Sequence, residues 1–453
     1  MNKRKEKFLI VGAGGRESAF ASKLNEEGNI SLYAVMDHEN PTIIDCIKES
    51  GGKYLVEDTT NVQAITKFAS KHKIDYVFVN ADAPLANGVV DELLKHKIKA
   101  VGGTKAATRI EWDKVYAMQL MEQNCPEFTP FHRIISSEAE LKDAIKEFKK
   151  KKLLVVVKPQ GLTGGKGVKV MREHLRTYQD SADYASLLLK QNKGEKVLLV
   201  ERLDGIEFTI MGFTDGHNLV MSPATYDYPY RLENDKGAGT GGMGCFTDSK
   251  KLLPFMNTKD SQSCRKIMQK IINAMRQDGL DFRGILNGGF FKTSKGIQFM
   301  EFNGRFGDPE ALNILTILKT PFSKVIKDLW HRRLRGDQIK FTNKASVIKY
   351  LVAKEYPDKS SRATRFEIDE QAIRNMGIKI YYASCIRDGN TYKTLKKSRV
   401  FALSKVAKNI ADASDSINQA IDNYVKSSLE YRRDIGSSNN LRKLTKLNDN
   451  LNE

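Results

Sequence analysis

The sequence predicts an α/β protein of several domains, the first of which is a doubly wound parallel sheet. Over residues 1–112, short apolar segments of strand length alternate with segments of helical pattern, which is typical of βαβ units. The chain of 453 residues is long enough to bury about two to four cores. Hydrophobic residues make up 40% and charged residues 28% of the chain, as in soluble globular proteins. No apolar run approaches the ~18 residues of a membrane span.

The first domain is expected to alternate strands and helices. Strands are predicted at 8–11, 32–35, 76–79 and from 100, and helices at 17–25, 61–71 and 89–95. Ligands of such sheets bind beyond the carboxyl ends of the strands, where residues 12–17 (GAGGRE) and 80–85 (NADAPL) lie. The glycine turn suits an anion at a helix N-terminus, and a tight turn that needs glycine for its backbone explains it equally well. The spacing departs from GxGxxG, which argues against a nicotinamide dinucleotide.

The second domain carries two lysines at the ends of predicted elements. A helix at 113–128 with Lys114 leads to strands at 131–135, 153–158, 168–171, 197–201 and 207–213 and a helix at 138–150. Lys158 ends one strand, and Lys166 lies in the glycine-rich segment 161–170 (GLTGGKGVKV). This order places both lysines on one antiparallel lid, and the glycines resemble a phosphate cradle. The segment is not a P-loop, since the spacing fails and a strand follows; a flexible hairpin loop is the alternative.

The segment EFNGRFGDPE, residues 301–310, indicates a metal and phosphate site. Strands are predicted at 288–291 and 297–302, with turn chemistry at 293–296. Alternate strand residues share a face, so Glu301 and Asn303 offer two oxygens side by side to a hard cation such as Mg²⁺. Arg305 enters a glycine-bounded loop from which it would reach a phosphate. The alternative is a hairpin end with a surface Arg–Asp pair.

The remaining segments predict a long functional loop, a third domain and a polar end. Residues 225–246 (TYDYPYRLENDKGAGTGGMGCF) are expected to be a long loop. Strands are predicted at 345–353 and 378–386, followed by a helix at 406–425 whose apolar face packs in the core. The polar residues after 436 are expected to be a frayed tail. The expected domains are therefore 1–112, 113–340 with a lid at about 129–200, and 341–436, followed by the tail at 437–453.

The chain is strongly basic, with a net charge of +19 and a pI near 9.4. Nucleic-acid binding, polyanionic small substrates and a basic proteome would each explain this charge. The basic clusters at 149–152, 331–335 and 396–399 lie apart and lack interleaved aromatic residues, so solvated faces are favoured over nucleic-acid binding. Five scattered cysteines without a CxxC motif, and a basic start that reads as a first strand, predict a cytoplasmic protein.

These segments together resemble the ATP-grasp ligases, and more closely the phosphoribosylamine–glycine ligase family of purine biosynthesis. The matching segments are GAGGRE, NADAPL, the pair Glu111 and Lys114, VVVKPQGLTGGKGV, VERLDGIEF, GTGGMG, EFNGRFGDPE and YRRDIG, and they span nearly the whole chain. The resemblance implies a central ATP-grasp domain with a mobile lid, and a small C-terminal α+β domain. It implies that ATP activates the glycine carboxylate as an acyl phosphate, which the amine of 5-phosphoribosylamine attacks. A monomer or a homodimer is expected, without a membrane.

The resemblance also implies a role for individual residues of this chain. ATP would be held by Lys114, Lys158, Gly164, Gly165, Lys166, Gly167, Glu201, Leu203 and Glu207. Mg²⁺ or Mn²⁺ would be held by Glu301 and Asn303. The substrates would be held by Gly14, Gly15, Arg16, Asp82, Gly242, Asp308 and Glu310. Arg305 and Asp227 would be catalytic, with Arg305 neutralising the phosphoryl group in transfer.

The chain departs from the family pattern on the side of the acceptor substrate. Ser18 replaces a His, NADAPL replaces GPEAPL, and Ala238 replaces a Pro. Residues 226–230 read Tyr-Asp-Tyr-Pro-Tyr where the family has Gln-Asp-His-Lys-Arg, so that Asp227 alone survives. A ligase with a different amine acceptor, or a non-catalytic nucleotide-binding paralogue, is therefore the alternative.

Overall fold

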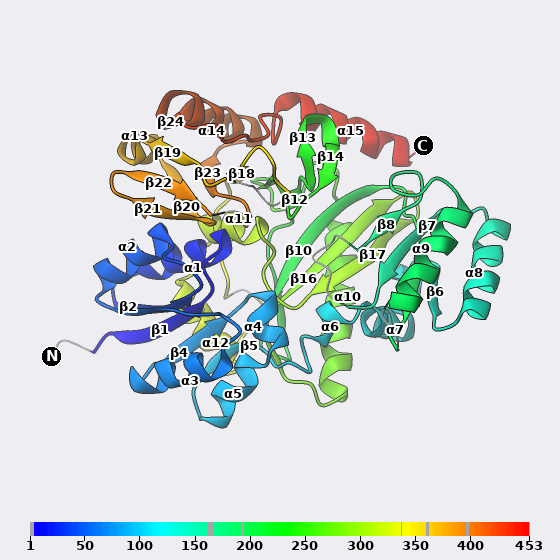
Figure 1. Cartoon of the computed structure of the whole chain (residues 1–453), viewed down its shortest axis with the longest axis horizontal. Helices are drawn as coiled ribbons and strands as arrows, with labels where there is room; N and C mark the ends of the chain where they lie inside the picture. Colours follow the sequence, from blue (N-terminus) through cyan, green and yellow to red (C-terminus); the bar gives the residue numbers. More distant parts are fainter. Residues whose placement is uncertain are drawn as a thin grey trace.

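The computed structural model describes residues 4–161, 167–191, 194–336, 338–358, 362–395 and 398–452. Figure 1 shows the N-terminal sheet and its helices in blue, a long central sheet in green and yellow, and the lid in cyan at one side. The C-terminal domain, in orange, lies over the N-terminal domain, and the last helix, in red, runs above the central sheet. No described helix is long and apolar enough to cross a membrane.

The N-terminal domain is the doubly wound parallel sheet that the sequence predicts. Its strands are β1 (Glu6–Val11), β2 (Ile30–Met36), β3 (Tyr54–Val56), β4 (Tyr76–Val79) and β5 (Ala100–Gly103), in the order β3-β2-β1-β4-β5. Its helices are α1 (Gly15–Asn25), α2 (Pro41–Ser50), α3 (Val62–Lys71), α4 (Asp82–Ala86) and α5 (Val89–Lys95). Phe8 and Ile10 of β1 belong to one core and Leu9 and Val11 to another, so both faces of the sheet are covered.

The central domain continues the same sheet. β16 (Phe282–Thr293) pairs antiparallel with β5, with β10 (Ile206–Thr214) and with β17 (Gly296–Asn303), and β11 (Leu219–Met221) forms the far edge. The hairpin of β16 and β17 confirms the two predicted strands and the turn between them. The helices of this region are α6 (Arg109–Trp112), α7 (Lys114–Asn124), α10 (Thr258–Gln277), α11 (Glu310–Ile317) and α12 (Phe322–Trp330).

The lid is a four-stranded antiparallel sheet with two helices. Its elements are β6 (His132–Ile135), α8 (Glu138–Lys150), β7 (Val155–Pro159), β8 (Lys169–Val170), α9 (Tyr178–Gln191) and β9 (Val197–Glu201), and its strand order is β6-β9-β7-β8. Leu141, Phe148, Val157 and Ala185 belong to a hydrophobic core of its own. The predicted phosphate loop falls largely outside the described residues, since Gly164, Gly165 and Lys166 are not among them.

The C-terminal domain corrects two predictions. Residues 378–386 are not one strand but two, β20 (Ile378–Tyr382) and β21 (Cys385–Asp388), which belong to different sheets. The predicted helix begins later, as α14 (Ile410–Tyr424), because β23 (Phe401–Ala407) occupies its expected start. The face of α14 is buried as predicted. The other elements are β18 (Ala345–Leu351), β19 (Arg365–Ile368), α13 (Glu370–Asn375), β22 (Thr391–Thr394) and β24 (Val425–Lys426).

Two segments expected to be irregular are ordered. Residues 225–246 contain β12 (Tyr226–Asp227), β13 (Tyr230–Leu232), the short helix η2 (Glu233–Asp235), β14 (Lys236–Gly239) and β15 (Gly244–Thr247). The expected tail forms helix α15 (Ser438–Asn452), with Leu444 buried and Leu441 and Leu451 packed against the core. The leucines recur at helical spacing, but the polar residues between them obscured that pattern in the sequence.

Candidate active site

Arg305 lies at the centre of a polar network that joins the N-terminal domain to β17. Its Nε donates to Oδ1 of Asp82 at 2.6 Å, and its Nη2 lies 3.1 Å from Oε1 of Glu111 and 3.4 Å from Oδ1 of Asn303. Burial alone would raise the pKa of Asp82, but Arg305 and Arg16 outweigh it and lower that pKa to about 2. Asp82 is therefore ionised between two guanidinium groups.

Arg16 approaches the same carboxylate from the glycine turn. Its Nη1 donates to the carbonyl of Phe306 at 2.9 Å and lies 3.7 Å from Oδ1 of Asp82, while its Nε donates to Glu17 at 3.0 Å. Glu17 also accepts from the amide of Gly14 at 3.0 Å, so that the side chain of the third helical residue satisfies the N-cap amide of α1. Arg16 and Arg305 together form a corner suited to a phosphate.

Gly15 is required by packing, as a Cβ there would lie 1.9 Å from the hydroxyl of Tyr350. Tyr350 comes from β18 of the C-terminal domain and is fully buried. The glycine thus lets two domains approach at the start of α1. This close approach is a stronger reason for glycine than the anion-binding turn considered from the sequence.

Glu301 and Asn303 lie two residues apart on β17, as predicted. Asn303 pairs in register with Asn287 of β16, so these two side chains share a face of the hairpin. Asn287 is 2% exposed, and its amide oxygen has no hydrogen-bond partner among the described residues. An unpaired buried oxygen beside a carboxylate and a second amide fits the donor set of a hard divalent cation.

Two of the predicted lysines lie within electrostatic reach of Glu301. Lys158 is buried at the end of β7 and donates to the carbonyl of Met300 at 3.1 Å; Lys114 donates to that of Gly161 at 2.7 Å. Burial lowers the pKa of both lysines, and Glu301 counteracts that shift in each case. The three side chains converge from β7, α7 and β17.

The residues expected around the nucleotide lie on β9 and β10 or near them. Glu201 ends β9 and accepts from the amide of Phe131 at 3.1 Å, and Leu203 follows it, partly exposed. Glu207 lies on β10 with an exposed side chain. Protein atoms around it still reduce its hydration, and with the repulsion of Glu301 they raise its pKa to about 7. Gly167 accepts from the hydroxyl of Tyr184 at 2.8 Å.

A cluster of carboxylates lies beside β12 and the start of α11. Burial raises the pKa of Asp227, and Glu310 raises it further; the Oδ1 of Asp227 is buried without a partner in the described part of the chain. Gly242, at φ +98°, approaches Asp227 so closely that a Cβ would lie 2.6 Å from that oxygen. Asp308 accepts from the hydroxyl of Tyr350 at 2.7 Å. This corner suits a positively charged amine.

Sequence reasoning missed four residues that hold these groups in place. Glu111, 8% exposed, binds Arg305 and the amide of Gly304, although the sequence had singled it out only as a matching residue. Arg399 was counted among solvated basic residues but is buried, lies 3.2 Å from Asp308 and donates to the carbonyls of Gly241, Gly242 and Asp308. Glu17 and Tyr350 are the other two. No local pattern marks Glu111, Arg399 and Tyr350, because their partners are distant in sequence, whereas Glu17 binds its neighbours Gly14 and Arg16.

Two of the departures from the family pattern, Ser18 and Tyr228, are absorbed by packing. Ser18 is buried and hydrogen-bonds to Asn40 and to the carbonyl of Tyr382. Tyr228 is 1% exposed, and the guanidinium of Arg432 lies 4.8 Å from the centre of its ring. These side chains therefore point into the protein.

Two surface cavities lie elsewhere, and no predicted site residue lines either. One of about 580 Å³ lies between η2 and α15 and is lined by residues such as Glu233, Asn440 and Lys443. The other, of about 700 Å³, is lined mainly by residues of 324–338.

The chain matches three family models in succession. These are the phosphoribosylglycinamide synthetase N domain over residues 6–111, its ATP-grasp (A) domain over 112–311 and its C domain over 346–438. A phosphoribosylamine–glycine ligase of Pyrococcus furiosus is 38% identical over 441 residues, covering 97% of each chain. One of Methanocaldococcus jannaschii is 37% identical over 447 residues, covering 98% of this chain and 99% of its own.

Solved structures share the fold. A phosphoribosylamine–glycine ligase from Thermotoga maritima has a TM-score of 0.77 at 22% identity, covering 95% of this chain and all of its own. The biotin carboxylase domain of a Hydrogenobacter thermophilus 2-oxoglutarate carboxylase, in complex with magnesium ADP, has a TM-score of 0.69 at 16% identity, covering 95% and 92%.

The lid over a central antiparallel hairpin, with lysines and acids converging between them, defines an ATP-grasp ligase. Among these enzymes, the chain belongs to the phosphoribosylglycinamide synthetase family. The resemblance inferred from the sequence is thereby confirmed.

Proposed function

We propose that this protein joins glycine to 5-phosphoribosylamine at the expense of ATP, giving glycinamide ribonucleotide, ADP and phosphate. Its family and the phosphoribosylamine–glycine ligases that it resembles over nearly their full length support this activity. The observation that carries it is the network through Arg305, which ties Asp82 of the phosphate corner to Asn303 of the metal pair. The guanidinium of Arg305 thereby lies between a residue expected to bind phosphoribosylamine and a residue expected to bind the metal ion.

ATP would lie between the lid and β17. Lys114, Lys158 and Lys166 would bind its phosphates with the glycines 164, 165 and 167, while Glu201, Leu203 and Glu207 would border the nucleoside. Glu301 and Asn303 would hold Mg²⁺ or Mn²⁺, and the unpaired oxygen of Asn287 supports a further oxygen donor there. When bound, the cation offsets phosphate charge.

The chemistry would proceed in two displacements. A carboxylate oxygen of glycine attacks the γ-phosphorus, and the bond to ADP breaks, which leaves glycyl phosphate. The amine of phosphoribosylamine then attacks the acyl carbon, phosphate leaves with the C–O bonding electrons, and the amine loses a proton. Arg305 would stabilise the phosphoryl group, and Asp227, whose pKa is raised, suits the acceptance of that proton.

The acceptor would lie at the edge of the N-terminal domain. Arg16, near Asp82 and the glycines 14 and 15, would bind the phosphate of phosphoribosylamine, while Asp308 and Glu310 would hold an amine. Gly242 keeps the acid corner open by leaving no Cβ beside Asp227. The alternative is a ligase with a different amine acceptor, which the sequence of residues 226–230 favours.

A three-substrate assay tests the proposal. Purified protein with ATP, glycine and freshly generated phosphoribosylamine is expected to release ADP only when all three are present, with one glycinamide ribonucleotide formed per ADP. A panel of other amines and amino acids is the control. ADP release with another amine alone would favour the alternative acceptor, and no amine-dependent release would favour a non-catalytic paralogue.

The setting of the enzyme is also a proposal. A cytoplasmic monomer or homodimer that binds no nucleic acid agrees with small-molecule substrates, and sedimentation together with a salt-dependent DNA-binding assay would test it. Limited proteolysis would test the proposed divisions after residues 112 and 340.

A further inference from the structure

The short hairpin of β13, η2 and β14, residues 230–239, is here called the acceptor hairpin because it connects two parts of the acid corner. Asp227 lies three residues before it, and Gly242 three residues after it. All four residues of β14 are exposed, and a two-stranded ribbon of this length has no core of its own. Contacts from elsewhere in the chain must therefore fix its position.

Arg432 supplies two of these contacts, from about 200 residues further along the chain. It is 1% exposed, and its Nη1 donates to the carbonyl of Tyr230 at 3.1 Å and to Asp235 at 2.9 Å. Its Nε and Nη2 donate to Asp434 at 2.9 and 2.7 Å, which holds the guanidinium plane in place. One buried side chain thus binds the start of β13 and the end of η2.

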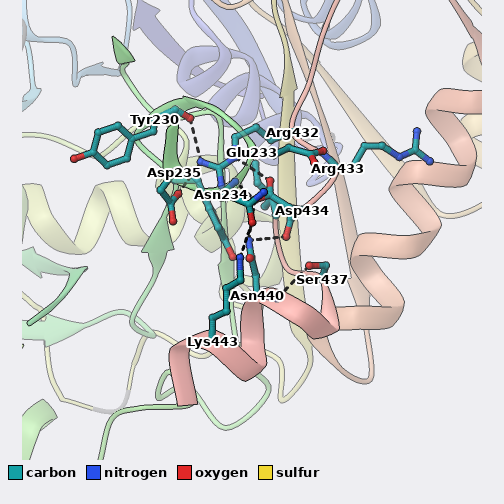
Figure 2. A network of polar contacts seen from close by, with 12 residues as sticks. Tyr230, Glu233, Asn234, Asp235, Arg432, Arg433, Asp434, Ser437, Asn440 and Lys443 are labelled. Atoms are coloured by element: carbon teal, nitrogen blue, oxygen red, sulfur yellow. Dashed lines mark hydrogen bonds and ion pairs between the residues drawn. The ribbon is translucent and has the colours of Figure 1, made fainter. Parts of the chain in front are cut away.

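The neighbours of Arg432 bind the tip of the acceptor hairpin (Figure 2). Asn234 has a left-handed backbone, at φ +59°, and its amide donates to Asp434 at 3.0 Å. Glu233 accepts from the amide of Arg433 at 3.1 Å, and Lys443 of α15 donates to the side chain of Asn234 at 2.5 Å. Asn234 and Asp235, the latter at φ +56°, are residue types that tolerate a left-handed backbone, and these contacts hold the tip in that shape. Residues 430–443, which make these contacts, are called the C-terminal clamp.

The acceptor hairpin also contacts the lid. The hydroxyl of Tyr230 donates to Glu173, in the turn after β8, at 3.2 Å, and Arg202 donates to the same carboxylate at 3.2 Å. Tyr230 therefore binds Arg432 through its backbone and the lid through its side chain. The acceptor hairpin lies between the C-terminal clamp and the lid.

We infer that the C-terminal clamp positions the acceptor hairpin for the amine acceptor, and that Arg432 is the positioning residue of this side of the site. The inference rests on the proposed function. Arg432 itself touches none of the groups expected to bind ATP, the metal or the substrates. Its loss should therefore weaken binding of the acceptor while leaving binding of ATP unchanged.

A pair of adjacent arginines provides the test. Arg432→Met removes the bonds to Tyr230 and Asp235 and those to Asp434. Arg433→Met removes a side chain that binds Asp422 and Tyr431 and leaves its amide bond to Glu233. Arg432→Met is expected to raise the KM for phosphoribosylamine about tenfold or more, with the KM for ATP within about twofold. Arg433→Met is expected to match the wild type in both constants.

Hydrogen exchange of residues 230–239 gives a readout that does not need turnover. Exchange should accelerate in Arg432→Met and not in Arg433→Met, even if the wild type proved to use another acceptor. Asp235→Asn changes the exposed partner of the same ion pair and replaces Arg432→Met in the test if that variant fails to fold. It is expected to accelerate exchange of residues 230–239 less than Arg432→Met would. Equal exchange and equal KM values in the two arginine variants would overturn the inference.

Discussion

At the scale of single residues, the site depends on charges whose partners come from distant parts of the chain. Arg305 binds Asp82 and Glu111, more than 190 positions before it. Burial raises the pKa of Glu111 to about 7 despite the opposing effect of Arg305. The residue types were visible in the sequence, but their environments were not, because burial and charge pairing exist only in the folded protein.

Replacing the proposed metal carboxylate should remove activity without unfolding the protein. Glu301→Ala is expected to lower ADP release at least about 100-fold, since a lost metal ligand costs no less than the 10–100-fold typical of groups that only orient one. Gln298→Ala, three residues earlier on β17, is the matched control and should keep near-normal activity. Thermal unfolding checks the fold, and calorimetry checks Mg²⁺-dependent ATP binding; near-normal activity of Glu301→Ala would contradict the metal assignment.

The raised pKa of Glu111 should appear in the pH dependence of stability. The folded protein keeps a proton on Glu111 up to about pH 7, whereas the unfolded chain loses it near its ordinary value of about 4.5. The free energy of unfolding therefore falls between these pH values as pH rises, by at most about 1.4 kcal/mol per pH unit from this group.

Glu111→Gln has no carboxyl group to titrate at this position. The unfolding free energy of this variant should therefore rise relative to that of the wild type as the pH increases from about 4.5 to about 7. Denaturant unfolding at pH 5, 6 and 7 gives the slope of the unfolding free energy against pH for the wild type and for the variant, and the two slopes are compared. Parallel curves for wild type and variant would show that Glu111 titrates normally.

At the scale of secondary-structure elements, local patterns were read well where an element is amphipathic or bounded by turn residues. β4, α5, α8 and β9 begin and end at the predicted residues, and the β16–β17 hairpin carries the predicted acid and amide. Patterns failed where polar residues obscure an apolar face or where two apolar strands follow each other closely. α15 was taken for a tail, and the break between β20 and β21 was missed because both strands are apolar around it.

The contact of α1 with β18 gives a prediction at this scale. Gly15→Ala would place a methyl group 1.9 Å from the hydroxyl of Tyr350 and should lower the free energy of unfolding by about 1–3 kcal/mol. Tyr350→Phe removes that hydroxyl and leaves the nearest ring atom, Cζ, at 3.0 Å. The double variant should therefore recover part of the loss, and a double-mutant cycle from denaturant unfolding measures this coupling. If the effects of the two substitutions on the unfolding free energy were strictly additive, α1 would have moved away from Tyr350 instead of clashing with its hydroxyl.

At the scale of the whole molecule, one sheet unites the N-terminal and central domains, whereas the lid has a sheet and a core of its own. The antiparallel pairing of β5 with β16 makes nine strands continuous. The net charge of +19 remains a property of the surface, apart from buried cations such as Arg399. The lid should therefore open as a unit separate from the continuous sheet.

Native-state hydrogen exchange should reveal that division. Amides of β7 and β9 in the lid are expected to open at a lower free energy than those of β1, β4 and β16, which share the continuous sheet. Mg²⁺ and ATP should slow exchange in the lid far more than in β1, because the nucleotide would bridge the lid and β17. A single opening energy for all five strands would refute separate units.

The sequence by itself determined the fold class, the order of the domains and the side chains offered at each strand end, because these depend on local periodicity and turn chemistry. Only the tertiary structure decided which of those side chains meet. Arg399, Glu111 and Arg432 act on partners between about 90 and 200 positions away, and no local pattern records such a distance. It also decided protonation, since the pKa of a carboxyl depends on the burial and charges around it.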